Sequence, residues 1–85
     1  MNFNNRRMLD MLPGQIAALE ARITGLNAVL ADADLYARDP ACFGATTDAL
    51  AAAWDELAAA EEQWLRLEML REEIEAAEPR SDAAP

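Results

Sequence analysis

The sequence contains no histidine and no lysine, and its only cysteine is Cys42. A lone cysteine cannot close an intramolecular disulfide, which fits a reducing compartment. Without histidine, a zinc site or a Cys–His nucleophile lacks its usual partner. The longest purely apolar run, 49–54, is mostly alanine and far shorter than a membrane span. No apolar stretch follows the early arginines, so we predict no signal peptide and expect a cytoplasmic protein.

Glycine, aromatic and β-branched residues are also scarce, with three glycines and 6 % aromatics. The chain has 85 residues, enough for one domain, and 20 are alanine and 11 leucine. This composition favours helices and excludes a β-sandwich, an α/β fold and a disordered chain. Seven arginines stand against 16 acidic residues, for a net charge of −9. The chain's own field therefore excludes strong non-specific binding of nucleic acid.

A heptad pattern runs through the first third of the chain. Large apolar residues alternate at steps of three and four, which predicts a coiled-coil seam along one helix. They are Leu9, Leu12, Ile16, Leu19, Ile23, Leu26 and Leu30. Because Pro13 cannot donate to the preceding turn, we expect the main helix to span about 13–31. Residues 1–12 then form a separate helical or irregular segment, or a kinked extension, that packs on the end of the second helix.

A second helix is predicted over about 40–77. Asp39 and Pro40 are typical of an N-cap and a first helical position, and Pro79 cannot continue a helix. Residues 78–85 are expected to be a flexible tail. The seam alternates large and small residues, which lets the facing helix approach closely at the alanines. It comprises Phe43, Thr46, Leu50, Ala53, Leu57, Ala60, Trp64, Leu67, Arg71 and Ile74.

Two heptad helices with a short connector predict an all-α fold, an antiparallel coiled-coil hairpin. Counting from the connector places Ile16, Ile23 and Leu30 opposite Leu57, Leu50 and Phe43, respectively. The second helix extends further than the first, and two of its apolar residues, Leu65 and Met69, lie away from the seam. Either the N-terminal segment covers them, through Phe3, Met8 or Met11, or they form a contact surface for a partner.

Several short motifs carry a family resemblance over residues 9–74. They are Leu12-Pro13 with Ile16, Leu19-Glu20, Asp34-Leu35-Tyr36, Arg38-Asp39-Pro40 with Phe43, Ala60-Glu61-Glu62, and Trp64 with Leu67-Glu68. In these the chain resembles the C-terminal coiled-coil domain of ABC-F ATPases, most closely the Uup-like branch. The resemblance implies an antiparallel two-helix coiled coil with a short helical turn in the connector. It also implies an appendage to two ATP-binding cassettes that contacts DNA or ribosomal RNA.

The chain itself has no GxxxxGK[ST] phosphate loop, so we expect neither ATP binding nor another cofactor. Acid–base catalysis needs a pocket that desolvates a carboxylate, and a two-helix hairpin offers none. We therefore predict no catalytic and no metal-binding residues. The predicted role is a non-catalytic contact domain.

Arginines supply the candidate contacts to phosphate, because a guanidinium can donate two parallel hydrogen bonds to it. At the open end of the hairpin these are Arg6, Arg7, Arg66 and Arg71, and at the tip Arg38 beside Tyr36. Two of them have an alternative partner at i,i+4 spacing, Glu62 for Arg66 and Glu75 for Arg71. Tyr36 in turn could cap the hairpin core.

The alternative function is that of a structural coiled-coil module that binds protein. It would dock on a partner, or associate with itself into a four-helix bundle. Its contact face would contain Leu65 and Met69.

Overall fold

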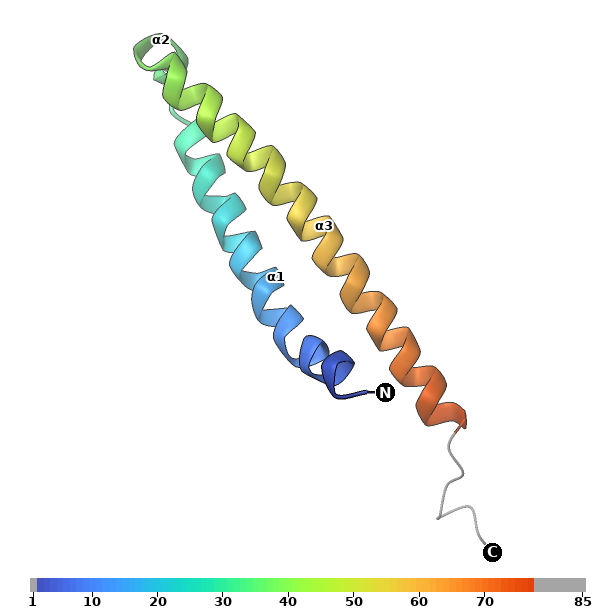
Figure 1. Ribbon diagram of the computed structural model, residues 1–85. Coiled ribbons are helices and arrows are strands. Elements are labelled where there is room, and N and C mark those ends of the chain that lie inside the picture. Colours follow the sequence, from blue (N-terminus) through green and yellow to red (C-terminus); the bar gives the residue numbers. More distant parts are fainter. Residues whose placement is uncertain (1, 78–85) are drawn as a thin grey trace, which may run out of the picture.

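The computed structural model describes residues 2–77, and this part of the chain is an all-helical hairpin without strands (Figure 1). Helix α1 spans Phe3–Leu30, α2 spans Leu35–Arg38 and α3 spans Pro40–Ala77. The two long helices lie side by side and antiparallel, with α2 at the tip, as predicted. None of the three helices is long and apolar enough to cross a membrane. The predicted tail, 78–85, lies outside the described residues.

The first helix begins earlier than predicted, because Pro13 lies inside α1 rather than at its start. The helix begins at Phe3 after Asn2, whose side-chain oxygen accepts a hydrogen bond from the Asn5 backbone N–H at 2.8 Å. A proline inside a helix removes one backbone hydrogen bond and bends the helix. The first turns of α1 do curve toward α3 in Figure 1. Residues before Pro13 are thus a kinked extension of the main helix.

Packing against α3 explains why the helix continues through the proline. Met8 and Leu9 pack against a cluster in which Leu12 of α1 and Leu67 of α3 are buried. The Gln63 side-chain amide of α3 also lies 3.6 Å from the sulfur of Met8. An internal proline costs about 3 kcal/mol. Burial of several large apolar side chains, at about 1.5–3 kcal/mol for each full burial, offsets that cost.

The connector is organised by two aspartates. Asp32 follows α1, and its carboxylate accepts a hydrogen bond from the Asp34 backbone N–H at 3.0 Å. Asp39 caps α3, since its carboxylate accepts from the Cys42 backbone N–H at 3.0 Å. Pro40 is the first residue of α3, where its missing N–H costs nothing. The predicted cap and first position are therefore confirmed.

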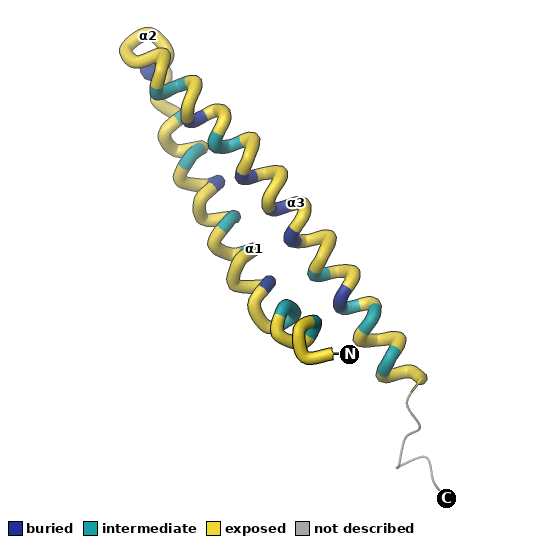
Figure 2. Tube along the Cα trace, in the orientation of Figure 1, coloured by how far each residue is buried: buried dark blue, intermediate teal, exposed yellow. Residues whose placement is uncertain are grey.

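The core is a single stripe between α1 and α3 (Figure 2). One cluster centres on buried Leu12, Ala60 and Leu67, and the other on buried Ile23, Ala53 and Leu57. Ala53 is the least exposed residue of the core, at 1 %. Its small side chain lets the helices approach closely there, as its position in the heptad predicts.

The clusters also follow the register expected from the connector. Leu50 and Ile16 both pack against the cluster nearer the tip, which contains their expected partners Ile23 and Leu57. Arg71 lies at a seam position of the heptad pattern but is exposed. Most of the apolar residues predicted for the seam thus lie in the two clusters. Leu30, Phe43 and Ile74, near the ends of the stripe, are half-buried and belong to neither cluster.

Candidate functional site

The open end of the hairpin brings Arg6 and Arg71 together across a groove between α1 and α3. Its other lining residues are Leu9, Asp10, Glu68, Ile74 and Glu75. Two guanidinium groups thus share the groove with three carboxylates. A phosphate group entering it would meet more negative than positive charge.

Two of the four open-end arginines are bound to carboxylates. Arg66 pairs with Glu62 at 2.7 Å, at the predicted i,i+4 spacing. Arg71 pairs with Glu68 at 2.5 Å, so the prediction that it pairs with Glu75 is wrong. At i,i+3 the two side chains also lie on one helix face, which makes both spacings available to Arg71.

Arg6 and Arg7 differ from these two. Both are exposed in the first turns of α1, and neither forms an ion pair with any residue between 2 and 77. Arg66 does not line the groove that Arg6 and Arg71 share. The predicted group of four therefore separates into two bound arginines on α3 and two on α1 without a carboxylate partner in the described chain.

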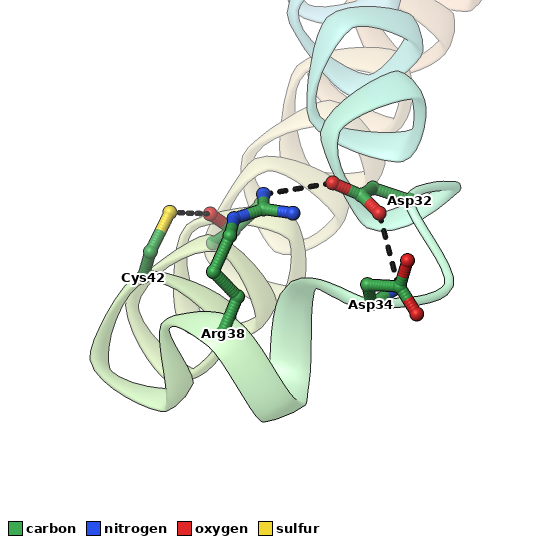
Figure 3. Close-up of polar contacts among 5 residues, drawn as sticks. Asp32, Asp34, Arg38 and Cys42 are labelled. Carbon is green, nitrogen blue, oxygen red and sulfur yellow. Dashed lines mark hydrogen bonds and ion pairs between the residues drawn. The ribbon is translucent and has the colours of Figure 1, made fainter.

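The tip holds the third ion pair (Figure 3). The Arg38 guanidinium donates to the Asp32 carboxylate at 2.8 Å. This bond, together with the backbone N–H of Asp34, lowers the pKa of Asp32, and Asp32 raises the pKa of Arg38. The pair ties α2 to the turn that follows α1, because Asp32 lies just after Leu30 and Arg38 is the last residue of α2. Arg38 is thus engaged within the fold, although its side chain remains accessible to solvent.

Tyr36 is exposed at the tip and also contacts Phe43 in the first turn of α3. Its ring meets that of Phe43 edge-on, with 5.2 Å between ring centres, while 66 % of the residue stays exposed. The prediction that Tyr36 caps the hairpin core is met only by this one ring contact, and its contact with nucleic acid stays a prediction. In the first turn of α3, the sulfur of Cys42 lies 3.9 Å from the hydroxyl oxygen of Thr46.

An apolar groove on one side of the hairpin was not predicted. Pro13 and Ile16 of α1 and Trp64 and Leu65 of α3 line it, and three carboxylates stand around it, those of Glu20, Glu61 and Glu62. Two helices contribute to the groove, so neither heptad pattern reveals it. The one feature of the sequence that could have indicated this groove is Leu65, a large apolar residue that does not lie at a seam position.

Leu65 and Met69 are exposed, at 55 % and 54 %. The N-terminal segment was one predicted cover for them, and this alternative is wrong. Phe3 and Met11 are themselves exposed, and Met8 packs into the seam cluster instead. The proline bend directs the N-terminal turns into the seam between the helices, so these turns do not reach the outer face of α3.

Two further observations concern the polar side chains of the described residues. Residues 2–77 hold no group of histidine, cysteine, aspartate or glutamate side chains that could bind a metal ion. Within the same range, every buried side-chain oxygen and nitrogen has a hydrogen-bond partner. The hairpin can present two kinds of surface to a partner: charged side chains at its open end and the apolar groove beside Leu65.

Comparison with known proteins identifies the family. The family model described as ABC transporter C-terminal domain matches residues 1–69 of the 85. No curated protein and no solved structure matches the chain. The match confirms the resemblance to the C-terminal domain of ABC-F ATPases drawn from the connector and the Trp64 region. The chain therefore belongs to the ABC transporter C-terminal domain family.

Proposed function

We propose that this domain is a non-catalytic appendage of a cytoplasmic ABC-F ATPase of the Uup-like branch, and that it contacts DNA or ribosomal RNA through Arg6 and Arg7. One observation carries the proposal. Arg6 and Arg7 are adjacent and have no carboxylate partner between residues 2 and 77, whereas Arg38, Arg66 and Arg71 are each paired. Arg22 also lacks a partner there, but it has no neighbouring arginine in the sequence. An unpaired guanidinium does not have to give up an existing bond before it binds phosphate.

The net charge of −9 sets the expected strength of this contact. Each neutralised phosphate contributes about −0.9 to the slope of log affinity against log salt, so two contacts give a slope of about −2. Affinity should be on the order of 10⁻⁵ M or weaker at physiological salt, within the range of non-specific binding.

The test is a titration of short duplex and single-stranded oligonucleotides at two salt concentrations. Arg6→Ala and Arg7→Ala should each weaken binding and reduce the salt slope. Arg22→Ala is the matched control, because Arg22 is an exposed α1 arginine that likewise forms no ion pair within residues 2–77. Equal losses in all three variants would contradict an open-end site, and no binding at low salt would contradict the nucleic-acid function.

A second function, docking on a protein, is favoured by a separate observation. Leu65 and Met69 are about half exposed on a helix whose other large apolar residues mostly face the seam. Exposed apolar clusters mark protein contacts. The partner would be another protein, the ATP-binding cassettes of a parent chain, or a second copy of the hairpin. Replacing Leu65 by lysine should abolish this contact while the helical fold stays intact.

A further inference from the structure

The apolar groove continues into a longer exposed stripe on α3. Leu65 lines the groove, and Met69 follows it at i+4, one turn further along the same face. Trp54, 52 % exposed, precedes Leu65 by about three helical turns and so lies on nearly the same side. Three large apolar side chains therefore share one side of the hairpin outside its core.

The stripe has the length of one helix-binding face. At 1.5 Å per residue, Trp54 and Met69 are separated by about 22 Å along α3. A helix of about 15 residues spans the same distance. Helices that dock in grooves do so through apolar side chains at i, i+3, i+4 and i+7. The groove lined by Pro13, Ile16, Trp64 and Leu65 provides a site between the two helices for such a side chain.

The charges around the groove select the chemistry of the occupant. Glu20 on α1 and Glu61 on α3 stand beside it, and neither is ion-paired within the described chain. Glu62 stands there too, bound to Arg66. A second copy of the hairpin would bring the same carboxylates against these, and like charges oppose association. An anionic helix or a nucleic acid would meet the same repulsion.

We propose that this groove and stripe bind a basic amphipathic helix, with an apolar side chain in the groove and lysine or arginine residues opposite Glu20 and Glu61. The inference rests on the protein-docking function given above as the second candidate, and it adds the place and the chemistry of the partner. It does not involve Arg6 or Arg7. The result of this test therefore does not decide whether Arg6 and Arg7 contact nucleic acid.

The probe for this inference is an 18-residue peptide of leucine and lysine, patterned so that leucine forms one helix face. It is titrated into the whole 85-residue chain, and binding is followed by the indole N–H resonances of Trp64 and Trp54. A peptide of the same pattern with glutamate in place of lysine tests charge. A leucine–lysine peptide of scrambled order tests the apolar face. Only the first peptide should bind and shift the Trp64 resonance.

Substitutions locate the site. Leu65→Lys should weaken binding of the leucine–lysine peptide by about tenfold, because it removes an apolar contact from the groove and places a positive charge opposite a basic peptide. Met11→Lys is the matched control, because Met11 is 49 % exposed and lies outside the groove. It should change the affinity less than twofold. Far-ultraviolet circular dichroism establishes that both variants keep the helical fold.

A second pair of variants tests the carboxylates. Replacing Glu20 and Glu61 together by glutamine should weaken binding severalfold and flatten its salt dependence. Replacing Asp48 and Glu56, by Asn and Gln respectively, removes the same charge from exposed positions outside the groove. If both double variants lose affinity equally, the affinity of the peptide depends only on the net charge of the domain, and the inference is overturned.

Two further outcomes separate this inference from the docking function on which it rests. If no peptide binds, but the wild-type chain self-associates in sedimentation and Leu65→Lys is monomeric, the basic helix is overturned and protein docking stands. If no peptide binds and the chain remains monomeric at millimolar concentration, the inference is overturned and a second copy is excluded as the docking partner. Docking on another protein or on the ATP-binding cassettes is tested separately, by the loss of that contact in Leu65→Lys.

Discussion

Replacing Leu57 by alanine should remove a large part of the stability of the hairpin. Leu57 is 5 % exposed and lies in the cluster with Ile23 and Ala53, against which Ile16 and Leu50 also pack. A buried leucine replaced by alanine costs 2–5 kcal/mol, from lost transfer energy and from the cavity that remains. We expect about 3 kcal/mol, because α1 is packed along its length and cannot collapse freely onto the smaller side chain.

The loss should be visible as a lower melting temperature. At about 4–8 °C per kcal/mol for a domain of this size, 3 kcal/mol corresponds to a fall of about 12–24 °C. The assay is thermal and urea unfolding followed by circular dichroism at 222 nm. Because alanine is at least as good a helix former as leucine, the loss does not come from helix propensity.

The matched control is Leu65→Ala, the same substitution on the same helix at a residue that is 55 % exposed. It should change stability by about 0.5 kcal/mol or less, as surface substitutions do. If Leu65→Ala costs as much as Leu57→Ala, the two helices are not paired through this seam and the reasoning is refuted.

Three other predictions concern the seam, the tip and ATP. Leu50→Asp should abolish cooperative unfolding in the same assay, since it places a charge in the seam beside Ile23; a cooperative transition at the wild-type temperature would contradict this. The Asp32 carboxyl should titrate below its ordinary pKa of 3.8, and Arg38→Gln should return it toward that value in carbon-13 NMR. Because the folded pKa is the lower one, the stability contributed by the pair is present above pH 3.8 and is lost as pH falls through the folded pKa; an unchanged Asp32 titration in Arg38→Gln would argue against the pair. The purified chain should not hydrolyse ATP in a phosphate-release assay, and turnover that remains with the protein through successive purification steps would contradict this.

Local patterns in the sequence were sufficient to predict most of the fold. Apolar residues spaced alternately by three and four positions follow the period of an α-helix. They therefore identify the buried stripe of a helix even when the helix that packs against it is unknown. Asp39 and Pro40 act on the backbone of their own turn, and the start of α3 therefore followed from the sequence. A short connector between two such helices leaves only an antiparallel arrangement.

The start of α1 could not be found in this way. Pro13 is a local signal against a helix, and the contacts that overcome it come from α3, more than forty positions further along the chain. The sequence predicted that residues 1–12 pack on the second helix, but only the folded arrangement shows that the helix continues through Pro13 and brings Met8 and Leu9 to the cluster around Leu67.

The candidate surfaces depended even more on tertiary structure. The sequence indicated that Leu65 lies outside the seam, but whether the N-terminal turns cover it depends on the direction of the bend at Pro13. Arg71 had carboxylates at both i−3 and i+4, and side-chain geometry decided between them in favour of Glu68. The groove beside Leu65 needs residues from two helices, so it exists only once the hairpin has closed and set their register.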